Sequence, residues 1–263
     1  MKVFLFDASI CNGCHGCQIA CKDEHCEQDW LPYAAAQPMT GQYWCKLDEV
    51  ERGKTPFVHV DYTVRMCDHC DCCKVLEMGR EDGSVYQRED GFVIIDPEKS
   101  KGRKDLAEAC ANVYWNEALQ IPQKCTACAH LLDDGWDVPR CVDFCPTGAL
   151  QFGEAESLDL EGAAPACEGS RFYYKNMPKR RICGTVADRS INEVIIGAKV
   201  TIADAEGNEV AQIETDELGD FIYKQADEGA FKVTIEADGY QPREFEVSTV
   251  EDDAVIGEVL VVR

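Results

Sequence analysis

The last third of the chain alternates apolar and polar residues with a period of two, which is the pattern of half-buried β-strands. In the run Phe231–Ala237 the odd-numbered positions are apolar and the even-numbered ones are polar. Turn residues such as Asp238-Gly239 separate this run from its neighbours. The β-prone runs are Cys183–Val186, Ala198–Ile202, Val210–Thr215, Phe221–Tyr223, Phe231–Ala237, Glu244–Val247 and Ile256–Val261. About seven short strands of this kind predict a small all-β sandwich.

The first two thirds of the chain are less regular. A short strand is predicted at Val3–Asp7 and the start of a helix at Ile19–His25. The segment from Glu27 to Tyr62 contains Trp, Pro and Gly residues without periodicity, so we expect an irregular insertion there. From Glu154 to Met177 the composition shifts to Glu, Gly, Ala and Pro, which predicts a linker or wrapping segment. A strand at Arg171–Lys175 is expected to close the first domain.

The middle of the chain predicts a hairpin followed by a helix. Val85–Pro97 holds two β-prone runs around a charged turn that ends in Gly91. Pro97 ends the second run because proline lacks a backbone donor. Lys104–Glu117 carries apolar residues at helical spacing, and we expect one helix across it.

Cysteine is the residue whose use departs most from that of ordinary globular proteins, with 17 among 263 residues. An odd number, clustered in Cys-x2-Cys pairs, favours metal binding over a disulfide framework. Thiolate ligands must stay reduced, so we expect a reducing, cytoplasmic setting. No secretory signal is recognisable, although export as the passenger of a signal-bearing partner stays open.

Charge and hydropathy argue against two classes of partner. The formal net charge is −23, whereas phosphate binding needs clustered Lys and Arg, so nucleic acid is not an expected partner. The simplest interpretation of the charge is a solvated acidic surface. No run of about 18 apolar residues occurs, so we expect no direct membrane insertion.

Two cysteine groups have the spacing of bacterial ferredoxins. The first is Cys11, Cys14, Cys17 and Cys21, and the second is Cys125, Cys128, Cys141 and Cys145, which Pro146 follows. In such a pair three thiolates of each group hold one [4Fe–4S] cube and the fourth thiolate ligates the other cube. We therefore expect one cluster on Cys11, Cys14, Cys17 and Cys145 and a second on Cys125, Cys128, Cys141 and Cys21. A structural zinc site does not explain the spacing of the first group.

With these groups the chain resembles a known family, the multi-cluster ferredoxin subunits of molybdopterin oxidoreductases. Members of the family carry four cysteine groups and four [4Fe–4S] clusters. One group follows a strand and reads Asp-Pro-Glu-Lys-Cys-x2-Cys-x2-Cys-x3-Cys. Here Asp96-Pro97-Glu98-Lys99 is followed, at those four positions, by Ser100, Arg103, Leu106 and Cys110. The resemblance implies that three ligands of one cluster have been replaced.

The fourth ligand of that cluster is replaced as well. It would be the last cysteine of the second group along the chain, and this position is Glu77. The neighbouring cluster keeps all four of its ligands, Cys67, Cys70, Cys73 and Cys110. The resemblance therefore implies three [4Fe–4S] clusters, with one site deleted cleanly. Cys72 competes with Cys73 as a ligand; the spacing of the first group favours Cys73.

Five cysteines and five histidines lie outside the three sets. Cys26, Cys45, Cys72, Cys167 and Cys183 are expected to be packed thiols. The cysteine sets are complete, so no histidine ligand is expected. His15 and His69 lie inside cluster loops and could tune a potential through hydrogen bonds, although surface positions are the simpler expectation for them.

The resemblance covers nearly the whole chain and implies its fold and role. The fold is α+β: residues 1–178 form a double ferredoxin-like domain with insertions, and residues 179–263 form a carboxypeptidase-regulatory-like β-sandwich. The chain itself would transfer electrons and hold no catalytic residue. Its expected partner is a large subunit that holds molybdenum and two pterin cofactors.

Several more specific roles remain open from the sequence. The three-cluster arrangement and the sandwich are most similar to small subunits of molybdopterin transhydroxylases that act on polyhydroxylated benzenes. Catechol dehydroxylases use similar small subunits and are a near alternative. A free polyferredoxin is a second alternative, but a soluble carrier needs neither the insertion at Glu27–Tyr62 nor a sandwich. A scaffold with purely structural clusters is a third.

Overall fold

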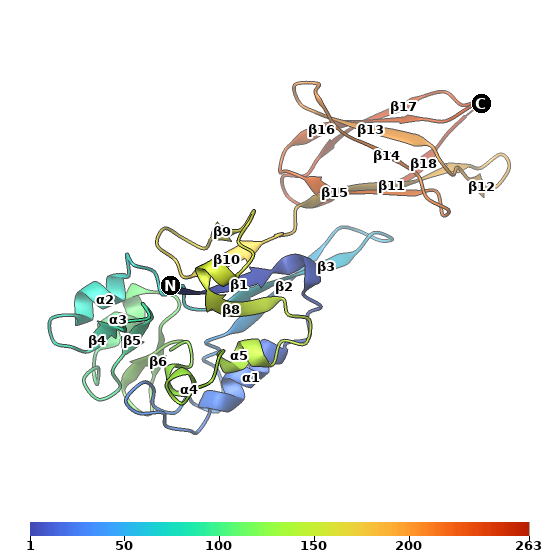
Figure 1. Cartoon of the computed structure of the whole chain (residues 1–263). Helices are drawn as coiled ribbons and strands as arrows, with labels where there is room; N and C mark the ends of the chain where they lie inside the picture. Colours follow the sequence, from blue (N-terminus) through green and yellow to red (C-terminus); the bar gives the residue numbers. More distant parts are fainter. Residues whose placement is uncertain (263) are drawn as a thin grey trace. The chain divides into compact units, whose positions relative to one another are not determined.

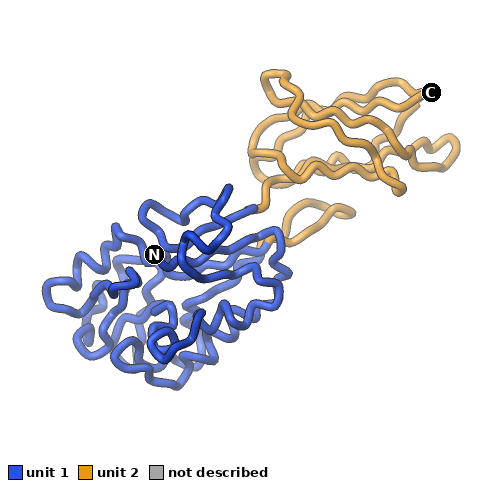
Figure 2. Tube along the Cα trace, in the orientation of Figure 1, with its two compact units in different colours: residues 1–49, 62–177 blue, residues 50–61, 178–263 orange. Residues whose placement is uncertain are grey.

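The structure, a computed structural model, describes residues 1–262 and divides into two compact units (Figure 2). The first unit comprises residues 1–49 and 62–177, and the second comprises residues 50–61 and the chain from Pro178 onward. Each unit has a hydrophobic core of its own. The two units are therefore described separately.

A four-stranded sheet forms the base of the first unit. Strand β1 (Lys2–Asp7) pairs antiparallel with β8 (Leu150–Glu154) and parallel with β10 (Phe172–Lys175), and β9 (Ala164–Pro165) adds to the edge of β10. The strand predicted at Val3–Asp7 and the one predicted near Lys175 are confirmed. The expectation of a linker at 154–177 is wrong in part, because this segment supplies two strands of the sheet.

Short helices follow the cysteine groups. Helix α1 (Gly16–His25) and helix α5 (Arg140–Asp143) lie side by side in Figure 1, and α4 (Ala129–Asp133) follows the third group. Two 3-10 turns, η1 (Ala8–Ile10) and η2 (Ala155–Ser157), follow β1 and β8. No helix among residues 1–262 is both long and apolar enough to cross a membrane.

The middle of the first unit is built from short elements. They are α2 (Lys74–Gly79), β4 (Val85–Gln87), β5 (Val93–Ile95), α3 (Lys104–Ala109), β6 (Tyr114–Asn116) and β7 (Ile121–Gln123). The hairpin predicted at Val85–Pro97 is confirmed as β4 and β5. The single helix predicted at Lys104–Glu117 is wrong beyond Ala109. Cys110 leaves the helix with extended backbone at φ −149° and ψ 132°, and β6 then pairs with β7.

The segment predicted to be irregular contains a two-stranded hairpin. Strand β2 (Lys46–Arg52) pairs with β3 (His59–Arg65), so that prediction is wrong for its second half. The hairpin tip, residues 50–61, belongs to the second unit. There the Gly53 N–H donates to the Asp252 carboxylate at 3.2 Å, and His59 Nδ1 lies 3.4 Å from the buried Asp253 carboxylate.

The C-terminal part of the second unit consists of two facing sheets. One has the order β12-β11-β15 with β18 also on β11, and the other has the order β14-β13-β16-β17. The strands are β11 (Arg180–Asp188), β12 (Glu193–Val194), β13 (Lys199–Asp204), β14 (Glu209–Glu214), β15 (Asp220–Ala226), β16 (Ala230–Glu236), β17 (Arg243–Ser248) and β18 (Ala254–Leu260). Phe231, Val233 and Ile235 are buried in their common core, which confirms the predicted alternation. Only the short β12 had no counterpart in the sequence pattern.

Candidate metal centres

The first Cys-x2-Cys turn of three cysteine groups, at Cys11–Cys14, Cys67–Cys70 and Cys125–Cys128, has one backbone feature in common. The residue directly before the second cysteine is left-handed in each: Gly13 at φ 70°, His69 at φ 45° and Ala127 at φ 53°. A left-handed residue bends the chain sharply between the two cysteines. Glycine is required at position 13 because an added Cβ would lie 2.3 Å from the Tyr62 ring.

The first predicted set lines a single cavity. Cys11, Cys14 and Cys17 from the first turn and Cys145 after α5 line one pocket, with Phe6, Leu47, Val64 and Leu150 among its apolar walls. Burial raises the pKa of the Cys11 thiol, and the charges of the other three cysteines raise it further. Like charges oppose ionisation only when they lie close together. The structure thus brings these four residues to one place.

The second predicted set is fully buried. Its members are Cys21 on α1, Cys125 and Cys128 in the third turn, and Cys141 on α5. Burial raises the pKa of Cys21 well above its usual value, and the charges of the other three thiols add to the rise. Four thiols that oppose one another's ionisation need a cationic centre to exist together as thiolates.

The third predicted set, Cys67, Cys70, Cys73 and Cys110, is gathered in the same way. Burial raises the pKa of Cys67, and the nearby thiols of Cys110 and Cys73 raise it further. Burial also raises the pKa of Cys70, and the nearby thiols of Cys73, Cys167 and Cys72 add to the rise. Cys73 is buried at the start of α2, whereas Cys72 is exposed. The Cys72 thiol instead donates to the Glu168 carbonyl at 3.4 Å.

The five cysteines outside the sets do not behave alike. Cys45 and Cys183 are buried, as predicted for packed thiols, and Cys26 is half-buried. The prediction is wrong for Cys72 and Cys167, which are both exposed. They lie on adjoining loops, because the Asp71 N–H donates to the Gly169 carbonyl at 3.0 Å.

Backbone donors are directed at cysteine sulfurs in two of the sets. The contacts are Gly16 N to Cys14 Sγ at 3.5 Å, Leu150 N to Cys145 Sγ at 3.4 Å and Ala127 N to Cys125 Sγ at 3.3 Å. Hydrogen bonds to sulfur favour the charged thiolate, and they are one of the means by which proteins set cluster potentials. The donor arrangement therefore suits a thiolate-bound cluster.

Unpartnered buried polar atoms also fit a bound cluster. Within residues 1–262, Thr126 Oγ1, His69 Nε2 and His25 Nδ1 are buried without a hydrogen-bond partner. Thr126 and His69 lie inside cysteine turns, and His25 Nε2 is 3.8 Å from Cys128 Sγ. Buried polar groups are nearly always satisfied, and the sulfurs of a cluster accept hydrogen bonds.

A single metal ion has no comparable site in this part of the chain. Across residues 1–262, no three His, Cys, Asp or Glu side chains are placed to hold one ion. The thiolates of a [4Fe–4S] cube bind four different irons, so they need not converge on one point.

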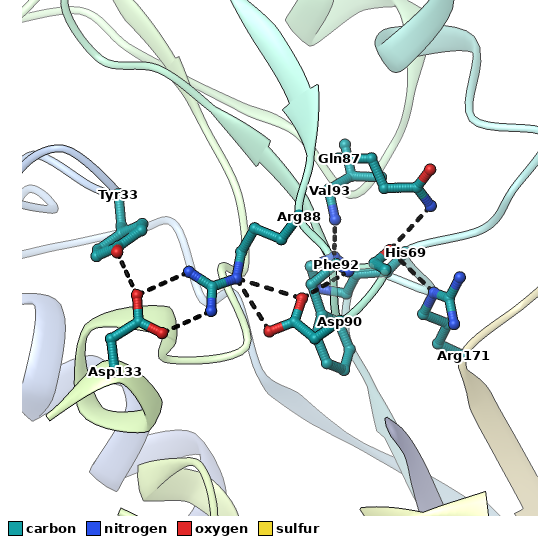
Figure 3. Close-up of polar contacts among 10 residues, drawn as sticks. Tyr33, His69, Gln87, Arg88, Asp90, Phe92, Val93, Asp133 and Arg171 are labelled. Carbon is teal, nitrogen blue, oxygen red and sulfur yellow. Dashed lines mark hydrogen bonds and ion pairs between the residues drawn. The ribbon is translucent and has the colours of Figure 1, made fainter. Parts of the chain in front are cut away.

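The histidines of the cysteine turns differ in environment. His69 is buried, so the expectation of a surface position is wrong for it; burial, Lys124 and Arg171 together lower its pKa well below the usual value. Its Nδ1 accepts a hydrogen bond from the Val93 N–H at 3.1 Å (Figure 3). His15 is partly exposed, and its Nε2 lies 3.0 Å from the Glu49 carboxylate.

The sequence did not single out two other buried groups near the sets. Burial lowers the pKa of His25 to about 3, and His130 lowers it further. Lys124 is buried directly before Cys125. A basic residue adjacent to a cysteine turn was the only available signal for Lys124, and local spacing says nothing about its burial.

The loop at 100–110 has the same left-handed turn, but only one of its four key positions, Cys110, is a cysteine. Gly102 is left-handed at φ 82° and directly precedes Arg103, as Gly13 precedes Cys14. Leu106 is fully buried in a small core that includes Cys73, Val75, Leu76, Val85, Val93, Ile95 and Val113. Arg103 pairs with Asp82 and Asp105 instead.

Comparison with known proteins agrees with this grouping of cysteines. Residues 58–155 match the 4Fe-4S dicluster domain, and residues 181–260 match the carboxypeptidase regulatory-like domain. The small subunit of pyrogallol hydroxytransferase from Pelobacter acidigallici is 36% identical over 251 residues, which is 89% of this chain and 90% of that one. The protein belongs to the family of iron–sulfur small subunits of molybdopterin oxidoreductases.

Other members of this iron–sulfur subunit family are similar over a shorter stretch. One of the chains of the anaerobic dimethyl sulfoxide reductase from Escherichia coli strain K12 is 31% identical over 62% of this chain and 80% of its own length. One of the subunits of tetrathionate reductase from Salmonella typhimurium is 31% identical over 57% of this chain and 56% of its own length. As a family member, the chain is an electron-transfer subunit with [4Fe–4S] clusters.

Proposed function

We propose that the chain holds three [4Fe–4S] clusters, one on each cysteine set. The ligands are Cys11, Cys14, Cys17 and Cys145 for the first; Cys125, Cys128, Cys141 and Cys21 for the second; and Cys67, Cys70, Cys73 and Cys110 for the third. The gathering of the thiols of each set is the observation that carries this proposal. When bound, such clusters supply one-electron transfer. The buried Leu106 supports a count of three.

Contacts between sets support a linear order. The Cys45 thiol donates to the first set at Cys17, which lowers the pKa of Cys17 to about 7. Hydrogen bonding to Cys141 of the second set is the largest cause of the raised pKa of Cys45. Cys67 of the third set adds to the raised pKa of Cys125 in the second, after burial. The contacts support an arrangement in which the second cysteine set, which is fully buried, lies between the first set and the third.

The first set is the proposed contact point with the catalytic partner. Cys14 is exposed, and a Cβ added at Gly16 would touch both the Phe144 ring and Cys14 Sγ. Phe144, Ile10 and Ile19 are large apolar side chains left exposed on this part of the unit. An apolar rim around an exposed cluster ligand fits the interface with a large subunit that holds the molybdenum–pterin cofactor.

We further propose residues 1–178 as a double ferredoxin-like domain and residues 179–263 as a separate sandwich domain. The first and last cysteine groups complete each other's sets, which supports two interlocked ferredoxin halves. The C-terminal strands have a core without a cluster ligand, so this domain is suited to docking rather than electron transfer. Free thiolate ligands favour the cytoplasm as the location.

The proposed reaction of the complex is hydroxyl transfer between polyhydroxylated benzenes. The match to the pyrogallol hydroxytransferase small subunit covers 89% of the chain, which is more than residues 1–178 alone could supply. The match to the dimethyl sulfoxide reductase relative covers 62%. Similarity that extends into the sandwich favours the transhydroxylase over a general reductase.

Iron and sulfide analysis of anaerobically purified protein tests the cluster proposal. We expect roughly twelve irons per chain, from three cubes of four. A value near sixteen would show that a fourth cluster survives at the 100–110 loop despite Leu106.

An assay of the natively purified complex tests the reaction. Pyrogallol and a tetrahydroxybenzene co-substrate are supplied without any added reductant, and we expect phloroglucinol to form. Product that appears only with a low-potential dye donor would contradict hydroxyl transfer and favour a dehydroxylase. Elution of the chain alone, with no large subunit, would favour a free ferredoxin.

A further inference from the structure

A lysine is buried between the second and third cysteine sets. Lys124 is 3% exposed. Its Nζ donates to the backbone carbonyls of Val93 and of Cys125, the latter at 3.0 Å, and lies 3.5 Å from His69 Nδ1. Cys125 is a ligand of the second proposed cluster, and His69 lies in the turn of the third. The ammonium group therefore sits where the two sets meet.

The charge of Lys124 is not compensated by a carboxylate. Within residues 1–262 the lysine forms no ion pair with Asp, Glu or a chain terminus. An ion in the protein interior is costly unless it is paired. The groups next to Lys124 belong to the two cysteine sets: its Nζ donates to the carbonyl of Cys125 in the second set at 3.0 Å and lies 3.5 Å from His69 in the turn of the third. Thiolate-bound clusters are thus the counter-charge that this lysine requires.

The other buried cation in this region does not have the same role. The Arg171 guanidinium donates to the Gly91 carbonyl at 2.9 Å and to the Asp71 carboxylate at 3.0 Å. Figure 3 shows Arg171 on the far side of His69 from Val93. Its charge is balanced by Asp71, so Lys124 is the unbalanced cation between the sets.

We propose that Lys124 raises the reduction potentials of the second and third clusters together, without a comparable effect on the first. The proposal rests on the cluster sites proposed above. A cluster that gains an electron becomes more negative, so a cation nearby stabilises its reduced form. The effect is strong in a protein interior, where the effective dielectric constant is low.

With clusters bound at the two sets, one electron would pass between them, so that one cluster is oxidised as its neighbour is reduced. No covalent bond would form or break, and Lys124 would act through its charge alone. The Cys45 side chain, and not a lysine, lies between Cys17 of the first set and Cys141 of the second, so electrons are expected to favour the second and third clusters over the first.

The test is a potentiometric titration of the full-length chain with its clusters loaded, followed by electron paramagnetic resonance. Lys124→Met removes the charge at similar length, Lys124→Gln removes it but keeps a donor, and Lys124→Arg keeps the charge. The matched control is Lys99→Met, which removes the same charge from a side chain that is 59% exposed and paired with Asp96. Iron content is measured for every variant.

We expect two of the three cluster signals to shift in both neutral variants. At a fixed potential the reduced-to-oxidised ratio of those two clusters should fall about tenfold, which is about 59 mV for a one-electron couple. The third signal, the Lys124→Arg protein and the Lys99→Met protein should match the wild type. Retention of clusters by Lys124→Arg but not by the neutral variants would also support a role for the charge.

Three outcomes would overturn the proposal. They are no shift in either neutral variant, an equal shift of all three signals, and a shift or cluster loss in Lys124→Arg as large as in Lys124→Met. The last would reduce Lys124 to a packing role. A wild-type chain with fewer than about twelve irons would instead contradict the proposed cluster set itself, so the two failures are distinguishable.

Discussion

The loop at Cys11–Cys21 and the loop at Ser100–Cys110 share a backbone turn but differ in the side chains that they enclose. Each has a left-handed glycine directly before its second key position, Gly13 in one and Gly102 in the other, and each runs into a helix, α1 or α3. In the first loop the thiols of Cys11, Cys14 and Cys17 line a pocket. In the second loop Leu106 is packed into a hydrophobic core.

The two loops differ in the side chain at the third key position. Cys17 lines the pocket of the first set, while Leu106 is packed into a hydrophobic core. Leucine supplies apolar burial where a cluster would supply iron–thiolate bonds. If a cluster site has been lost here, as we propose, the loop keeps a structural role, because the Leu106 core also includes Cys73 of the third set.

The largest expected effect comes from the thiols that remain near the filled loop. Cys110→Ala and Cys73→Ala should each remove one cluster, roughly four of twelve irons, and spare the other two. Cys72→Ala is the matched control, since this thiol is exposed, donates to the Glu168 carbonyl and is not a proposed ligand, and its iron content should equal that of the wild type. Iron analysis of each variant is the measurement. Loss of iron in Cys72→Ala with none in Cys73→Ala would make Cys72, and not Cys73, the ligand of the third set.

The next largest effect is expected for Leu106→Ala, which should lower the stability of the protein without changing its iron content. Leu106→Ala should destabilise the protein by about 2–5 kcal/mol, because a fully buried leucine leaves a cavity when truncated, while about twelve irons are retained. Denaturation followed by circular dichroism measures the first quantity, and iron analysis the second. An unchanged unfolding midpoint would mean that Leu106 does not replace the cluster structurally.

The two glycines should respond differently to alanine. Both lose left-handed freedom, a penalty of about 1–2 kcal/mol. At Gly102 nothing lies within 4 Å of an added Cβ, whereas at Gly13 the Tyr62 ring is 2.3 Å away. Gly102→Ala should therefore cost only the backbone penalty, and Gly13→Ala should cost about 1–3 kcal/mol more for overpacking. Equal thermal shifts in the two variants would contradict this difference.

The smallest expected effect concerns an ion pair that fastens the hairpin of β4 and β5 to α4. Arg88 binds both carboxylate oxygens of Asp133 at 2.7 and 2.9 Å, and Tyr33 donates to the same group (Figure 3). Asp133→Asn should cost about 0.5–1 kcal/mol, because the carboxylate is partly exposed and screened. Thermal unfolding of the variant beside the wild type measures the difference.

The pH dependence of that pair has a defined sign. Hydrogen bonds from Arg88 and then Tyr33 lower the pKa of Asp133 to about 2, below its value in the unfolded chain. The stabilisation is therefore fully present above about pH 4 and is lost as the pH falls toward 2. The gap between wild type and Asp133→Asn should be the same at pH 7 and pH 5; a gap that closes by pH 5 would contradict the lowered pKa.

The sequence by itself predicted the β-rich C-terminal part and the grouping of the cysteines. Both depend on short-range patterns: a period of two marks Phe231 to Ile235 as strand, and cluster chemistry fixes how cysteine groups combine. The sequence also predicted one missing cluster, because Ser100, Arg103, Leu106 and Glu77 stand at the four positions where the resemblance implies its cysteines. The family followed from these residues.

Only the tertiary structure decided what lies around the cysteines. Spacing left Cys72 and Cys73 as competitors; Cys73 is buried in a small core and Cys72 is exposed on an adjoining loop, which supports the proposal of Cys73 as the ligand. Helical periodicity carried the predicted helix past Ala109, where β6 pairs with β7 instead. The burial of His69 and Lys124 has no local signal, since segments far apart in the chain enclose them. Long-range packing, which no window of sequence contains, sets which charges are buried beside the clusters.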